Sequence, residues 1–194
     1  QFYYFFAMKQ WDGEPPVVAV PSGNFGNLAS GILARISGLP VKKFIAACNA
    51  NDVVPRYFAT GEYCPRASVT TLSNAMDVGD PSNFVRILEM LGRNFADVTE
   101  YLTTAAISDA ETIETVRQVN RDHGYVLDRH GAVAFRALSD HLEENAGDKG
   151  IILETAHPIK FDSVNEMIAG SVPMPDSIGD LAGKKKVTIE IGPD

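Results

Sequence analysis

The stretch Pro21–Asn27, Pro-Ser-Gly-Asn-Phe-Gly-Asn, constrains the fold of this chain more than any other. It follows Val17–Val20, a short apolar run that is typical of a buried strand. It precedes Leu28–Gly38, whose small and apolar residues predict a packed helix. A strand, a turn and a helix in this order leave backbone N–H groups without partners where the helix begins. Because these amides and the helix dipole favour negative charge, we expect an anion site here, with a phosphate monoester as ligand.

Two glycines and three polar residues within the turn support this interpretation. Gly23 and Gly26 let an anion approach the backbone closely. Ser22, Asn24 and Asn27 offer side-chain donors or helix caps. The turn lacks the Gly-Lys-Ser/Thr of a P-loop and the Gly-x-Gly of a dinucleotide fingerprint. On these residues alone, a tight strand-to-helix turn without a ligand is an equal alternative.

The rest of the chain alternates between strand-like and helix-like segments. Such alternation predicts an α/β fold with a mainly parallel sheet and helices on both faces. A capping box, Ser108 with Glu111, marks the start of one helix. The other expected elements are strands over 42–47, 151–154 and 187–191, helices that begin near 52, 83 and 128, a helix over 160–169 and a loop over 62–81.

Composition narrows the class of protein. The 194 residues are 45% hydrophobic and 22% charged, which is ordinary for a globular protein with a sizeable core. A formal net charge of −8 without a basic stripe argues against a nucleic-acid partner. Cys48 and Cys64 show no metal-binding spacing and are too few for a disulfide framework, so we expect a reducing cytoplasm and no metal. No apolar run approaches the ~20 residues of a membrane-spanning helix.

Several stretches match one known family in its own order along the chain. They are Val20–Asn27, Gly38–Ala47, Asn49–Arg56, Thr71–Val78, Asp128–Val133 and Thr155–Phe161. These stretches resemble threonine synthases, which are pyridoxal-phosphate (PLP) enzymes of fold type II. The resemblance implies a fold like that of the tryptophan synthase β-subunit and PLP as cofactor. It also implies the conversion of O-phospho-L-homoserine and water to L-threonine and phosphate.

The resemblance also assigns roles to single residues. It places the contacts with the PLP phosphate in the loop, at Ser22, Gly23, Asn24, Phe25, Gly26 and Asn27. It makes Thr155 the partner of the pyridine nitrogen, whereas the residue alone favours a β-branched strand end.

Asp128 and His130 match the family as well, and the resemblance implies that they shape the substrate pocket or relay protons there. A helix-capping aspartate and a first-turn histidine explain the same pair. Arg129 and Gly131 stand where the family usually has proline and threonine, which weakens the assignment.

No lysine of this chain lies in a segment like the one that carries the family's Schiff-base lysine. The resemblance therefore implies a C-terminal fragment that is inactive alone, has no catalytic residue of its own and does not hold PLP covalently. Residues 1–12 are expected to end a helix from a missing N-terminal half, and residues 13–194 to form the domain that binds the PLP phosphate. The aromatic run at 2–6 predicts self-association.

Two other functions fit part of the pattern. Threonine dehydratases and cysteine synthases share the glycine loop but not the blocks at 49–56 and 155–161. A regulatory domain that binds a phosphate-bearing ligand without catalysis would need no lysine.

Overall fold

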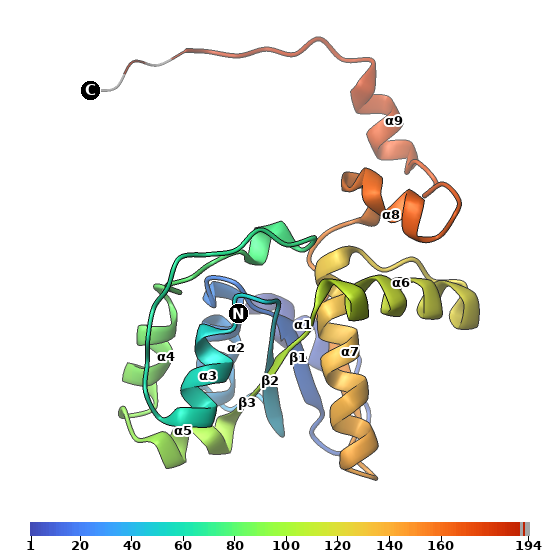
Figure 1. Cartoon of the computed structure of the whole chain (residues 1–194). Coiled ribbons are helices and arrows are strands. Elements are labelled where there is room, and N and C mark those ends of the chain that lie inside the picture. The colour runs from blue at the N-terminus through green and yellow to red at the C-terminus, as the bar shows by residue number, and fades with distance from the viewer. Residues whose placement is uncertain (191, 193–194) are drawn as a thin grey trace.

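The chain folds around one parallel sheet (Figure 1), as a computed structural model of residues 1–190 and 192 shows. Among those residues the sheet has four strands in the order β3-β2-β1-β4, and each neighbouring pair is parallel. The strands are β1 (Val17–Pro21), β2 (Lys43–Cys48), β3 (Leu102–Ala106) and β4 (Gly150–Ile152). The expected α/β fold with a mainly parallel sheet is confirmed.

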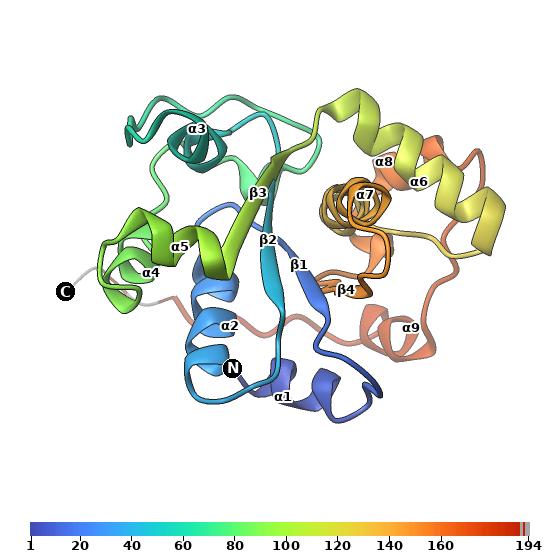
Figure 2. The same ribbon diagram turned by 90° about the horizontal axis from the view of Figure 1, so that it is seen from below.

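Helices cover both faces of the sheet (Figure 2). The α-helices are α1 (Phe2–Met8), α2 (Gly26–Ile36), α3 (Val53–Thr60), α4 (Phe84–Met90), α5 (Phe95–Tyr101), α6 (Asp109–His123), α7 (Arg129–Glu144), α8 (Asp162–Met167) and α9 (Asp176–Ala182), and the short 3-10 helices are η1 (Asn74–Met76) and η2 (Pro158–Lys160). No helix among the described residues has both the length and the apolar character needed to cross a membrane.

The alternation of side chains along β1 divides the core between the two faces. Val18 and Val20 pack in the cluster that includes apolar residues of α2 and α4. Val17 and Ala19 pack in a second cluster with apolar residues of α7. All four side chains are completely buried, as expected for a parallel strand that is covered on both sides.

The sequence located most elements, and the differences have physical causes. The capping box of Ser108 and Glu111 is present at the start of α6. The helix expected over 160–169 is divided, because η2 ends at Lys160 and α8 begins only at Asp162. β3 and α5 were not expected from the sequence.

The edge strand expected over 187–191 is wrong for Val187–Glu190, which form no regular structure, while Ile191 lies outside the described residues. Val187 and Ile189 are more than four-fifths exposed, so their alternation with polar residues has no sheet edge to pair with. In Figure 1 this segment extends away from the rest of the chain.

The aromatic segment at 2–6 forms α1, and one of its rings anchors it to α2. The Tyr4 ring is only 2% exposed and meets Phe44 of β2 edge-on. Its hydroxyl donates to the backbone and side-chain oxygens of Asn27 at 3.0 Å. Gly31 of α2 has no side chain where this ring lies, since a Cβ there would come within 2.5 Å of it.

The order of the strands determines where a ligand can bind. From β1 the chain proceeds outward to β2 and β3, and it then returns to the other side of β1 as β4. The direction of winding therefore reverses between β1 and β4. Open parallel sheets bind ligands at such a reversal, beyond the carboxyl ends of the two strands. These ends lead directly into residues 21–27 and 153–155.

Candidate functional site

The loop after β1 presents a run of free backbone amides. Residues 1–190 and 192 supply no hydrogen-bond acceptor for the N–H groups of residues 23–28. The flanking amides are paired, since Ser22 N–H donates to Ala47 at 2.8 Å and Ala29 N–H donates to Phe25 at 2.9 Å. Six consecutive unpaired donors where α2 begins are an arrangement that can bind an anion.

The backbone of the loop takes an uncommon turn at Phe25. This residue has φ +63° in the left-handed region, which is rare for a residue with a large side chain. Its ring is buried and lies edge-on to Phe84 of α4, with ring centres 5.5 Å apart. Tyr57 and Tyr63 pack around the same Phe84 ring. The aromatic core therefore keeps the loop in this conformation.

A cavity of about 520 Å³ lies against the loop and brings together segments from across the sequence. Most of the predicted site residues line it, together with residues of η1, the end of η2 and Phe161. Its lining is Pro21, Gly23, Asn24, Phe25, Gly26, Asn27, Ala75, Met76, His130, Thr155, Ala156, Lys160 and Phe161. The site predicted from widely separated stretches is thus a single space.

Two predicted site residues lie outside this lining. Ser22 is buried beneath the loop, and its hydroxyl donates to the carbonyl of Val20 at 2.8 Å, so it braces the turn. Asp128 is completely buried and caps α7, where it accepts hydrogen bonds from the backbone of His130 and Gly131. Thus the capping interpretation of Asp128 is confirmed.

The two loop asparagines are each held through their side-chain oxygens. Asn24 Oδ1 accepts from the backbone and hydroxyl of Ser82, at 2.7 and 3.0 Å. Asn27 Oδ1 accepts from the hydroxyl of Tyr4. Because an amide oxygen that accepts leaves its NH₂ group as the remaining donor, both side chains can add donors to the amide cradle.

The buried carboxylate of Asp128 lies beside the partly buried carboxylate of Glu154. Glu154 lies two residues beyond the end of β4. Its carboxylate accepts from Asp128 N–H at 3.0 Å and from the Tyr125 hydroxyl at 3.2 Å. Burial and the nearby Asp128 charge raise the pKa of Glu154 to about 7. Burial opposes ionisation of Asp128 too, but hydrogen bonds from His130 hold the pKa of this carboxyl below its usual value. The Asp128 carboxyl is therefore the charged member of the pair.

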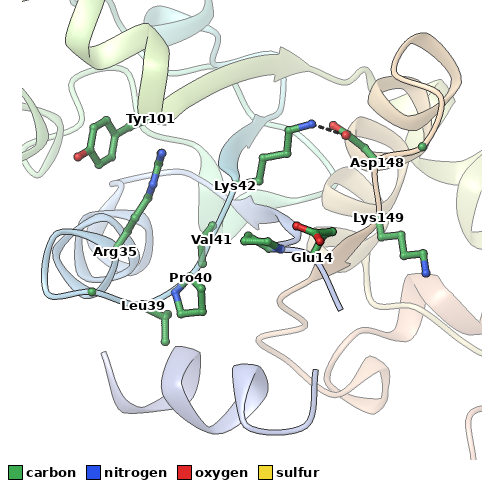
Figure 3. A pocket seen from close by; sticks show the side chains of 12 residues that line it. Glu14, Arg35, Leu39, Pro40, Val41, Lys42, Tyr101, Asp148 and Lys149 are labelled. Atoms are coloured by element: carbon green, nitrogen blue, oxygen red, sulfur yellow. Dashed lines mark hydrogen bonds and ion pairs between the residues drawn. The ribbon is translucent and has the colours of Figure 1, made fainter. Parts of the chain in front are cut away.

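A larger cavity, of about 690 Å³, lies at the amino-terminal edge of the sheet (Figure 3). Two of its cations have neighbours: Lys42 bonds Asp148, and the Arg35 guanidinium lies 4.0 Å from the centre of the Tyr101 ring. No predicted site residue lines it. It lies at the amino-terminal ends of the strands, whereas the predicted site lies beyond their carboxyl ends. The loop cavity is therefore the candidate site.

Sequence reasoning missed Glu154, Ala75 and Met76 as parts of the site. Met76 belongs to a stretch that matched the family, but no local pattern indicated that it lies on the loop. Glu154 directly precedes the predicted Thr155, and a carboxylate at the end of an apolar strand was the available signal. Of the two basic residues considered for a phosphorylated substrate, Lys160 lines the cavity, while Arg56 pairs with Asp52 at 3.1 Å.

These features fit the phosphate group of PLP. A phosphate ester needs several convergent donors and close access to the backbone, and six free amides beside a cavity provide both. In the described part of the chain, no group of three or more histidine, cysteine or acidic residues is arranged to hold a metal ion.

Comparison with known proteins agrees with this interpretation. Residues 3–154 match the family model described as "Pyridoxal-phosphate dependent enzyme". The chain belongs to this family. Residues 131–194 match a second family model, "Threonine synthase, C-terminal".

The similar proteins are threonine synthases. The threonine synthase of Haemophilus influenzae is 45% identical over 91% of this chain and 41% of its own length. The crystal structure of the Escherichia coli threonine synthase has 44% identity and a TM-score of 0.84, over 93% of this chain and 42% of that one. A PLP-bound threonine synthase from Brucella melitensis has 29% identity and a TM-score of 0.82, over 95% of this chain and 45% of that one. The expected resemblance is confirmed, and the chain spans about two-fifths of the length of these relatives.

The two loop glycines provide a matched test of the packing on the loop. A Cβ at Gly23 would come within 2.6 Å of the Met76 Cα, whereas a Cβ at Gly26 would meet only Asn83 Nδ2, at 3.4 Å. We expect Gly23→Ala to lower the free energy of unfolding by about 1–3 kcal/mol and Gly26→Ala to change it by less than about 0.5 kcal/mol. Urea unfolding measures both, and equal effects would contradict the packing of Met76 on Gly23.

Glu154 gives the stability of the protein a predictable dependence on pH. An unfolded glutamate ionises near about pH 4.3, but the folded-state pKa of Glu154 is about 7. Between these values the folded state binds more protons, so its stability falls as pH rises. We expect Glu154→Gln to remove this fall and to be more stable than the parent at pH 8, by about 1 kcal/mol because the group is only partly shielded from solvent. Parallel stability profiles of variant and parent from pH 4 to 8 would contradict this.

Proposed function

We propose that this chain forms the part of a threonine synthase that binds the PLP phosphate. The whole protein would convert O-phospho-L-homoserine and water to L-threonine and phosphate. One observation carries the proposal: residues 23–27, whose amides are unpaired, line a cavity that Thr155 also lines. The similarity to threonine synthases over nine-tenths of the chain supports this choice among PLP enzymes.

In this proposal each part of the cavity has a role. The amides of Gly23, Asn24, Phe25 and Gly26 bind the cofactor phosphate, and Asn27 completes the cradle. Thr155 lies beyond β4 and would face the pyridine nitrogen. A hydroxyl there does not impose a proton on the ring nitrogen as an aspartate would. PLP would supply an electron sink beside the α-carbon of the substrate.

The lysine that binds PLP covalently would come from outside these 194 residues, because none of the lysines in this chain lies in the cradle. Lys160 does line the cavity, but it does so from the side of η2 and α8. We assign it the attraction of the substrate's phosphate. The alternatives are another fold-type II enzyme, such as a threonine dehydratase, and a non-catalytic phosphate-binding domain.

Two further proposals concern the surroundings of the protein. Both cysteines are free, with Cys48 buried and Cys64 exposed. Free thiols favour a reducing compartment, so we propose the cytoplasm. The acidic net charge of −8 makes a nucleic-acid partner unfavourable.

Product analysis tests the proposed activity. We expect the native protein that carries this chain to release threonine and phosphate from O-phospho-L-homoserine in equal amounts. The 194-residue chain alone should release no phosphate above background, because the covalent lysine is not among its residues. Formation of ammonia from threonine would instead support a dehydratase. Phosphate release by the isolated chain, free of host enzyme, would refute the proposal that the covalent lysine lies outside these 194 residues.

Self-association through residues 2–6 is also proposed. Phe2, Tyr3 and Phe6 of α1 are 65–85% exposed, and burying such rings contributes roughly 1.5–3 kcal/mol each. A two-fold contact between copies of α1 is the simplest way to cover them. Replacing Phe2, Phe5 and Phe6 with serine should shift the isolated chain toward monomer in sedimentation.

The control for this experiment is the pair Val187→Ser and Ile189→Ser, which removes exposed apolar surface from the other end of the chain. We expect this pair to leave the association unchanged. A parent chain that is monomeric at high concentration would contradict the proposal.

A further inference from the structure

Both ring nitrogens of His130 are engaged within the protein. The Asp128 carboxylate can only accept, so Nδ1 of His130 carries a proton and donates it across 2.7 Å. On the other side of the ring, the backbone N–H of Ala75 can only donate, and it lies 3.3 Å from Nε2. These two partners require the neutral imidazole with its proton on Nδ1.

The Ala75 contact links α7 to a segment far away in the sequence. Ala75 lies in η1, whose last residue, Met76, contacts the phosphate loop. The Met76 backbone lies so close to Gly23 that a Cβ on this glycine would come within 2.6 Å of it. One hydrogen bond from Ala75 to His130 therefore ties this wall of the cavity to the start of α7.

The start of α7 is also bonded to the segment that follows β4. The backbone N–H of Asp128 donates to Glu154, which precedes Thr155. A chain of hydrogen bonds thus runs from the end of β4, through the start of α7, to η1. The His130 ring also packs on Phe161, with ring centres 5.2 Å apart, which limits its rotation.

We propose that His130 is a positioning residue for the phosphate loop. Its unprotonated Nε2 holds Ala75, and thereby holds the Met76 backbone against Gly23, so that the loop amides stay open to an anion. The inference rests on the proposed function, because the anion is taken to be the phosphate of PLP. His130 lines the cavity but has no free nitrogen, so this arrangement leaves it no part in proton transfer.

Removing either partner of the bond tests the proposal in the native protein that carries this chain. His130→Leu removes the acceptor, and Ala75→Pro removes the donor at an exposed position in the first turn of η1. We expect each variant to speed hydrogen exchange of the amides of residues 76–78. Each should also weaken binding of PLP, titrated into the apo protein, by about tenfold.

The two effects should not add. Because both changes break the same bond, the double variant should bind PLP no more weakly than the weaker single variant. His130→Gln provides rescue, since its amide oxygen can accept from Ala75, and it should restore most of the lost affinity. His141→Leu is the matched control, because His141 lies on the same helix and also bonds an aspartate, Asp148, at 3.1 Å.

Each outcome supports or overturns the proposal. Unchanged exchange in His130→Leu and Ala75→Pro would overturn it, as would faster exchange with unchanged PLP affinity. Equal losses in His130→Leu and His130→Gln would reduce the role of His130 to filling space. If His130→Leu does not fold, Ala75→Pro decides alone. A parent protein that binds no PLP would refute the proposed function, while exchange would still test the bond between His130 and Ala75.

Discussion

Unpaired backbone amides are the constraint on which this structure depends. The N–H groups of residues 23–28 have no acceptor among the described residues, and half of these residues are exposed, so a ligand can reach the loop. The surrounding structure holds the loop in this conformation. The pairing of Ser22 with Ala47 fixes the end of β1, the Phe25 ring is held in the aromatic core, and the Met76 backbone closes the space beside Gly23. The conformation of the loop, with its amides unpaired, is therefore imposed by packing against distant parts of the chain.

The topology of the sheet explains why the other site residues gather at the same place. The strands beside β1 bring the segments that follow them toward its loop, and β4 joins β1 with the winding reversed. The chain after β4 therefore delivers Thr155 to the cavity. The α7 helix, which packs on the same face as Val17 and Ala19, delivers His130.

Features with local signals could be predicted from the sequence. The first strand, the glycine loop and the capping box of Ser108 and Glu111 each depend on residues within a few positions of one another. Thr155 was predicted only through the resemblance to a family, because the residue by itself does not distinguish a site residue from a strand end. β3 was not predicted, because its sequence, Leu-Thr-Thr-Ala-Ala, has no clear alternation of apolar and polar residues.

The remaining features depend on contacts between distant residues. Ala75 meets His130 across 55 positions, and Tyr125 meets Glu154 across 29. No pattern in the sequence indicates such pairs. The segment at 187–190 is the converse case, since alternation was present but no neighbouring strand was available. Asp128 left two roles open in the sequence, and the hydrogen bonds that it accepts from the backbone of His130 and Gly131 establish the cap.

The left-handed backbone at Phe25 has a consequence for the affinity of any anion that binds the loop. Aromatic packing with Phe84 maintains this conformation. The loop therefore has little conformational freedom to lose when an anion binds, and preorganisation of this kind favours tighter binding.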